Sequence, residues 1–114
     1  MKIEGPGKAI AIFIGEMDHW HGKSLYSAIV EKAREMGLAG ATVTKGVMGF
    51  GAQSRIHTAS ILRLSEDLPV VIQIVDTVER IEKFLPVLDE MVEEGMVMTW
   101  DVTIEKYVHS AKGS

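Results

Sequence analysis

The residue types best able to do chemistry gather in one short stretch, GFGAQSRIHT, at residues 49–58. Glycine adopts backbone torsions closed to other residues and lets a ligand approach the main chain, and exposed N–H groups in such turns can receive an anion. Gln53, Arg55 and His57 add polar and charged side chains to the same stretch. Together these residues indicate a ligand-binding loop. By spacing alone, a loop whose glycines only make turns is the simpler interpretation, because short glycine motifs often match by chance.

A second group of residues combines carboxylates and imidazoles: Glu16, Asp18, His19 and His21. These ligand types suit a divalent metal. The two histidines would share a face only if a strand continued through them, and Gly22 indicates a turn instead. The group therefore predicts either a weak metal site or a loop that leads into a helix and caps it with Asp18 or Ser24.

Hydrophobic periodicity predicts the elements that must position these residues. Strands are expected at residues 8–17, 41–47, 68–75 and 97–108, and helices at 23–36 and 77–94. The first and third strands are apolar on both alternating faces, which is typical of the centre of a sheet, while the second and fourth suit its edges. Pro86 is expected to kink or restart the second helix.

The order β-α-β-β-α-β predicts an α+β domain of the ferredoxin-like split βαβ type, with an antiparallel sheet and two helices on one face. Residues 1–114 are expected to form a single domain, with 1–7 and 109–114 as flexible tails. A long loop at 50–67 joins the second and third strands and contains most of the GFGAQSRIHT stretch. Apolar residues of the central strands, such as Ile12, also require a cover on the open sheet face, which oligomerisation would supply.

Composition and charge narrow the function classes. The chain has 114 residues, 46% of them apolar, a formal net charge of −4 and a pI near 5.5, and its 12 Lys and Arg residues are scattered. No basic stripe is present to attract nucleic acid, so no nucleic-acid partner is expected. The sequence has no cysteine, and its longest apolar runs are too short to cross a bilayer. We therefore expect a cytoplasmic protein without membrane insertion.

Residues 40–58, GATVTKGVMGFGAQSRIHT, resemble the segment of PII signalling proteins that runs from the second strand into a long regulatory loop. LPVVIQIV at residues 68–75 is similar to the third strand of those proteins. GEMDHWHGKSLYSAIVEKAREMGLAGATV at residues 15–43 resembles still more closely the PII-like domain-of-unknown-function family 190. This resemblance covers nearly the entire chain.

The resemblance implies a homotrimer of ferredoxin-like subunits with an adenine nucleotide in each cleft between neighbours. In the PII pattern, Thr42 lies near the adenine and Val75 lies against the base. Gly51 meets the nucleotide through its backbone, and Gln53 lies by the phosphates or their Mg²⁺. Gln73 stands where the pattern often has a glutamate. The nucleotide-binding candidates are Thr42, Gly49, Phe50, Gly51, Gln53, Arg55, His57, Gln73 and Val75.

The chain departs from the PII pattern where the second helix joins the fourth strand. PII proteins have a loop rich in Gly and Lys there, which holds the distal phosphates, whereas this chain has EEGMV at residues 93–97. Two acids repel phosphate, so AMP is favoured over ADP or ATP, and a cyclic nucleotide also fits. Arg55 and Arg63 would replace part of the missing positive charge. The implied function is regulation of an unidentified partner protein, such as a transporter or channel, through the mobile loop.

Two other function classes stay open. The chain would be a trimeric divalent-metal-binding or scaffold protein if the group of two carboxylates and two imidazoles bound a metal. It would be a small hydrolase if His57 acted as a base with Glu16 or Asp18 as its partner. The sequence contains no nucleophile elbow, Walker loop or HExxH motif. We therefore assign no catalytic residue and expect a protein that is not an enzyme.

Overall fold

The computed structural model describes residues 1–50, 57–58 and 67–110. Its elements are β1 (Lys2–Gly15), β2 (His19–Trp20), β3 (Lys23–Ser24), α1 (Leu25–Glu35), β4 (Thr42–Lys45), β5 (Met48–Gly49), β6 (His57–Thr58), β7 (Pro69–Asp76), α2 (Val78–Met91) and β8 (Met96–Val108). The two helices and the four longest strands follow the order expected from the sequence, and two short strand pairs that were not expected, β2–β3 and β5–β6, are added. Among the described residues, no helix is both long enough and apolar enough to cross a membrane.

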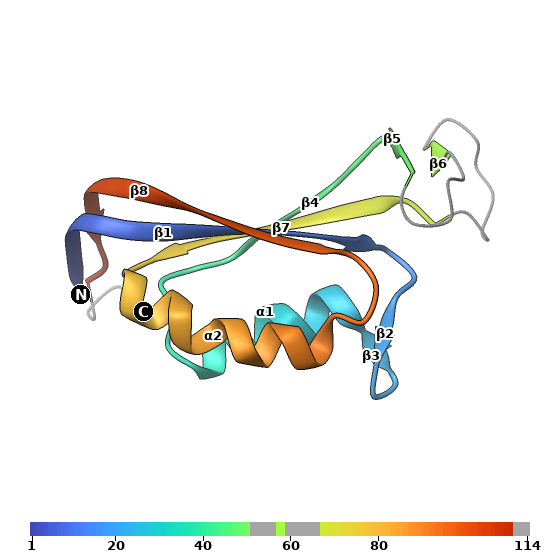
Figure 1. The fold of residues 1–114 in the computed structure, drawn as a ribbon, viewed down its shortest axis with the longest axis horizontal. Coiled ribbons are helices and arrows are strands. Elements are labelled where there is room, and N and C mark those ends of the chain that lie inside the picture. The colour runs from blue at the N-terminus through green and yellow to red at the C-terminus, as the bar shows by residue number, and fades with distance from the viewer. Residues whose placement is uncertain (51–56, 59–66, 111–114) are drawn as a thin grey trace.

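Four strands form one antiparallel sheet in the order β4-β7-β1-β8. The first and third predicted strands correspond to β1 and β7 and lie in the centre, while β4 and β8 form the edges. Both helices cover the same face of this sheet, as Figure 1 shows. The β2–β3 and β5–β6 pairs are separate two-stranded sheets. The expected α+β fold, with an antiparallel sheet and two helices on one face, is confirmed.

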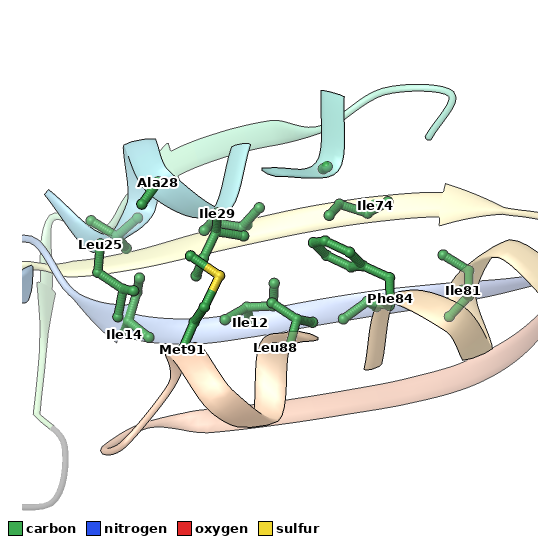
Figure 2. Packing of buried hydrophobic residues seen from close by; sticks show 14 residues of the cluster. Ile12, Ile14, Leu25, Ala28, Ile29, Ile74, Ile81, Phe84, Leu88 and Met91 are labelled. Carbon is green, nitrogen blue, oxygen red and sulfur yellow. The ribbon is translucent and has the colours of Figure 1, made fainter. Parts of the chain in front are cut away.

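The core lies between the helices and one face of the sheet. On β1 and β7 every second residue points to the helices, so the cross-strand partners Ile12 and Ile72 are fully buried. Ile29 of α1 and Phe84 of α2 belong to the same buried cluster. Figure 2 shows their side chains meeting those of the strands. Burial of one such side chain stabilises the fold by about 2 kcal/mol, so this face gives the sheet and helices their common core.

Residues 1–7 are not the flexible tail that the sequence predicted. β1 begins at Lys2, pairs with β8 along this segment, and buries Ile3. Its register shifts between Ile3 and Gly5, whose φ of +98° suits glycine, and such an irregularity bends a strand. Figure 1 shows this end of β1 bending together with β8. Pro6 is tolerated because the pairing with β7 begins only at Lys8, so the strand has one neighbour here and a missing N–H costs little.

The two ends of the described chain also hold each other. The amino group of Met1 donates to the carbonyl of His109 at 2.7 Å, and the N–H of His109 donates to the carbonyl of Met1 at 2.8 Å. His109 is therefore paired rather than part of a free tail. Residues 111–114, the rest of the predicted carboxy-terminal tail, lie outside the described residues.

The second helix does not restart at Pro86. α2 runs as one helix from Val78 to Met91 with Pro86 inside it. A proline inside a helix leaves the carbonyl four residues earlier without its N–H partner. That residue is Glu82, and both Glu82 and Pro86 are exposed, so water can satisfy the carbonyl. The exposed position explains why the helix continues.

The sheet face opposite the helices is apolar and uncovered. Ile12 is 0% exposed whereas its neighbour Phe13, on the other face, is 40% exposed. Phe13 pairs with Met96 of β8, and Ala9 pairs with Trp100. The prediction that Ile12 belongs to this surface is therefore wrong, because its side chain points to the helices. We call this surface the open face; its apolar residues are Phe13, Val71, Val75, Met96, Met98 and Trp100, together with Ala9 and Ala11, which are themselves buried.

Candidate functional site

The residues that flank segment 50–66 are tied to one another and to the turn after β1. The N–H of Gly46 donates to the carbonyl of Pro69 at 2.7 Å, and the N–H of Glu16 donates to the carbonyl of Leu68 at 2.8 Å. The carboxylate of Asp67 accepts the N–H of Met17 at 2.8 Å. These contacts fix the point where the GFGAQSRIHT stretch leaves the sheet. We call them the loop base, formed by Glu16, Met17, Lys45, Gly46, Asp67, Leu68 and Pro69.

An ion pair joins β4 to the turn after β1 within the loop base. The ammonium of Lys45 lies 2.5 Å from a carboxylate oxygen of Glu16. The hydrogen bond to Glu16, together with the negative charge of that carboxylate, raises the pKa of Lys45 above its ordinary value of 10.5. Glu16 is therefore engaged in holding β4 to the end of β1.

Gly49 and its neighbour Gly46 are required by contacts with Pro69 rather than by unusual torsions. A Cβ at Gly46 would lie 2.7 Å from Cγ of Pro69, and a Cβ at Gly49 would lie 2.9 Å from the same atom. Neither glycine has a φ in the left-handed region. The sequence suggested special torsions in this stretch, and at Gly49 the structure shows close packing of the backbone against a proline ring instead.

Three of the nucleotide-binding candidates lie together at the edge of the open face. Thr42 on β4 pairs directly with Gln73 on β7, and Val75 lies two residues further along β7 on the same face. All three are exposed, Val75 by 43%. Neither the Thr42 hydroxyl nor the Gln73 amide makes a hydrogen bond with another described residue. The group offers one apolar and two polar contacts, the combination by which protein sites hold an organic ring.

A second set of candidates lies on the β5–β6 hairpin beyond β4. Gly49 pairs with His57, so the hairpin brings two ends of the GFGAQSRIHT stretch together. Phe50, next to Gly49, is 68% exposed. Gly51, Gln53 and Arg55, together with Arg63, lie outside the described residues.

The carboxylates and imidazoles after β1 do not converge on a point where a metal would sit. Glu16 is paired with Lys45, and Oδ2 of Asp18 accepts the N–H of Gly15 at 2.9 Å. His19 and His21 belong to the β2–β3 hairpin, where His21 has a φ of +47°. Within the described part of the chain, no three His, Asp or Glu side chains form a group that could hold a metal ion. The predicted metal site has no geometric support from these residues.

The start of α1 also differs from the expected cap. Ser24 occupies the N-cap position, but its side chain makes no capping hydrogen bond. The N–H of Leu25 donates instead to the backbone carbonyl of Asp18 at 2.8 Å. Asp18 therefore organises the turn with both its carboxylate and its carbonyl.

A cavity of about 450 Å³ opens between the β2–β3 hairpin and the turn that joins α2 to β8. Its lining residues are Asp18, His19, Trp20, His21, Leu25, Met91, Glu93 and Glu94. The rings of Trp20 and His21 stack with their centroids 4.1 Å apart. Asp18, His19 and His21 of one wall were singled out from the sequence, but the cavity itself was not predicted, because its two walls are far apart in the chain.

The profile of one protein family, DUF190 (Uncharacterized ACR, COG1993), matches residues 7–104. The chain belongs to the DUF190 family. A UPF0166 protein of Aquifex aeolicus is 34% identical over 97 residues, which are 85% of this chain and 91% of that protein. A UPF0166 protein of Methanocaldococcus jannaschii is 35% identical over 100 residues, which are 87% of this chain and 92% of that protein. The resemblance seen in the sequence is confirmed.

Solved structures share the fold of this DUF190 chain. CPII, a nitrogen regulatory PII-like protein from Thiomonas intermedia K12 solved with ADP, AMP and bicarbonate, matches with a TM-score of 0.59 at 17% identity, over 87% of this chain and 88% of that one. CutA from Synechococcus elongatus PCC7942, complexed with Bis-Tris, matches with a TM-score of 0.59 at 12% identity, over 95% and 90% of the two chains. At these identities the likeness establishes the PII-like, ferredoxin-like fold.

Proposed function

We propose that this DUF190 protein is a PII-type regulator that binds an adenine nucleotide. The observation that carries the proposal is the grouping of Thr42, Gln73 and Val75 on the two strands that flank the loop base. Adenine is recognised by an apolar surface with a few fixed polar groups, and these three side chains supply both. The likeness to CPII, a protein solved with ADP and AMP, adds support.

The proposed site needs a second wall, which we assign to a neighbouring subunit of a homotrimer. On the open face Phe13, Met98 and Trp100 are 40%, 44% and 41% exposed. Contact of so many apolar side chains with water is unfavourable, and such a patch is typical of a surface buried between copies. A copy seated on the open face would reach its edge, where Thr42 and Gln73 lie.

We propose AMP as the preferred nucleotide. The turn between α2 and β8 carries the exposed acids Glu93 and Glu94 and no basic residue. Carboxylates repel phosphate, and the repulsion grows with the number of phosphate charges. AMP or a cyclic nucleotide therefore fits better than ADP or ATP, and Mg²⁺ is needed only where outer phosphates must be neutralised.

The regulatory output would come from segment 50–67, which contains Gly51, Gln53 and Arg55. In this proposal the bound nucleotide contacts that segment and changes its interaction with a partner protein in the cytoplasm, for example a transporter or channel. The loop base supports such a role because hydrogen bonds tie the residues on either side of the segment to each other and to the turn after β1. A ligand at the sheet edge would thus act on a segment whose flanking residues are held together.

The two alternative functions receive less support. The hydrolase hypothesis needs Glu16 or Asp18 as the partner of His57, but Glu16 is paired with Lys45 and Asp18 accepts the N–H of Gly15. The metal hypothesis needs converging ligands, and the described residues contain no such group. We therefore propose a regulator without catalytic activity.

Titration calorimetry with AMP, ADP and ATP, with and without Mg²⁺, tests the proposal on the full chain. AMP should bind at least as tightly as ATP, Thr42→Val should weaken AMP binding, and Gly51→Val should abolish it by blocking approach to the backbone. Thr99→Val, which removes a hydroxyl from β8, is the matched control and should bind normally. Absence of saturable binding by any of the three nucleotides would overturn the proposal. Much tighter ATP binding would overturn only the argument from Glu93 and Glu94.

A further inference from the structure

The cavity beside the β2–β3 hairpin has the size of a small-molecule site. Its volume of about 450 Å³ lies within the range of roughly 300–1,000 Å³ that is usual for small-molecule sites. None of the residues proposed for nucleotide binding lines it. Glu93 and Glu94, which oppose outer phosphates in the proposed function, do line it, so a group that binds here is expected to be a cation and not the nucleotide. The inference rests on the cavity and not on nucleotide binding.

The cavity is lined by carboxylates that form no ion pair with any described residue. Glu93 and Glu94 line it from one wall, and neither forms an ion pair with a described residue. Asp18 lines the other wall and uses only Oδ2 in its hydrogen bond to Gly15. Lys23, the basic residue of the hairpin, is turned to Glu31, which its ammonium contacts at 2.8 Å. A cation is therefore the complementary occupant.

One wall of the cavity is aromatic. Trp20 is partly buried against the hydrophobic core, and its ring stacks on His21 at an interplanar angle of 11°. Contact with the core holds the indole in place. Because His21 covers one face of the indole, a cation would have to approach the other face, and tryptophan attracts a cation over its ring more strongly than the other aromatic residues do.

The arrangement selects an organic cation rather than a metal ion. A divalent metal requires several ligand atoms that converge at about 2.0–2.6 Å from one point. The carboxylates and imidazoles of this cavity do not meet that condition, since the described residues contain no group of three that could hold a metal. We propose that the cavity between Trp20 and the Glu93–Glu94 turn binds a guanidinium or alkylammonium group, which stacks on the indole and pairs with the carboxylates. Such a group would come from a small free molecule or from a basic side chain of a partner.

Butylguanidine and butylurea test the proposal because they have nearly the same shape and differ in charge. We expect butylguanidine to bind the full-length protein with a dissociation constant on the order of 1 mM or below and to shift the indole NMR signal of Trp20, but not that of Trp100. Butylurea should do neither. The peptide acetyl-Gly-Arg-Gly-amide distinguishes the two sources: tighter binding than butylguanidine points to a partner side chain, and weaker binding points to a free molecule.

Paired variants locate the site. Glu93→Gln with Glu94→Gln keeps the side-chain shapes and should weaken butylguanidine binding by about tenfold or more. Glu82→Gln with Glu105→Gln removes the same charge from other exposed positions and should leave binding unchanged. Trp20→Leu should also weaken binding, and circular dichroism checks its folding; if it misfolds, the glutamine pair decides. Equal binding of butylurea, no effect of the Glu93 and Glu94 changes, or Zn²⁺ or Mg²⁺ binding that these changes abolish would each overturn the proposal.

Discussion

The two faces of the central sheet differ although the same strands form them. On the helix face, Ile12 and Ile72 pair across β1 and β7 and are fully buried by α1 and α2. On the open face, the neighbouring Phe13 is 40% exposed and Trp100 is 41% exposed. The chain buries one face by itself and leaves the other exposed. A strand with apolar residues on both faces is typical of a sheet that is buried on both sides. In this chain the two helices bury only one of them.

The largest expected effect is on the helix face. Ile12→Asp would place an unpaired carboxylate in the core, and the free energy of unfolding should fall by about 4 kcal/mol or more. Phe13→Asp, one residue away on the open face, should lower the free energy of unfolding of the subunit much less. Urea denaturation followed by circular dichroism compares the two variants. Equal destabilisation by both would show that the two faces do not differ in the way that the structure indicates.

The next effect concerns the open face. Wild-type protein should scatter light as a particle of about three times the 12.5 kDa chain. Trp100→Asp should reduce the mass to that of one chain while the circular dichroism spectrum is kept, because a charge on this surface cannot be buried between copies. Thr99→Asp, on the neighbouring position of β8, is the control and should keep the larger mass. A wild-type monomer at micromolar concentration would contradict the trimer and remove the second wall of the nucleotide site.

Much of the fold was predictable because burial repeats along the chain. Alternating isoleucines in β1 and β7 and the spacing of Leu25, Ile29 and Ala33 in α1 mark which side faces the core. The amino-terminal segment was not predictable, because Gly5 and Pro6 are typical of a turn. They lie within β1 because a long β8 pairs with that segment, and such a partner is invisible in a local pattern.

The candidate site was predictable in part. Thr42 and Gln73 were candidates through the family resemblance. Their pairing was not predicted, since register between distant strands is set by the whole sheet. The contact of Gly49 with Pro69 could not be predicted, because a glycine in a sequence is equally consistent with an unusual backbone torsion and with close packing of the backbone. The Glu16–Lys45 pair also depends on tertiary structure, which is why Glu16 was placed among metal ligands instead.

A smaller effect is expected at Gln73, where a substitution can distinguish a role in ligand binding from a role in contact between copies. Gln73→Ala should weaken AMP binding by about 1 kcal/mol, the usual loss for one polar contact, and should leave the particle mass unchanged. Thr44→Ala provides the control, because Thr44 lies on the same face of β4 but pairs with Val71 rather than Gln73. Calorimetry gives the affinity and light scattering gives the mass. A loss of mass in the Gln73 variant would mean that Gln73 belongs to the subunit contact.

The smallest expected effect lies at the loop base, which belongs to neither face. The folded-state pKa of Lys45 is raised above 10.5 by Glu16, so the stabilisation by this pair is fully present below the unfolded pKa and is lost as pH rises through the folded pKa. Both side chains contact solvent, with 54% of Lys45 and 25% of Glu16 exposed, so the contribution is small and screened by salt. Glu16→Gln should therefore lower the melting temperature slightly at neutral pH and low salt, and the difference from wild type should vanish above the folded pKa of Lys45. Glu105→Gln, an exposed carboxylate on β8, should show no such dependence. A difference that persists at high pH would mean that the Glu16 side chain stabilises the fold through a contact other than its ion pair with Lys45.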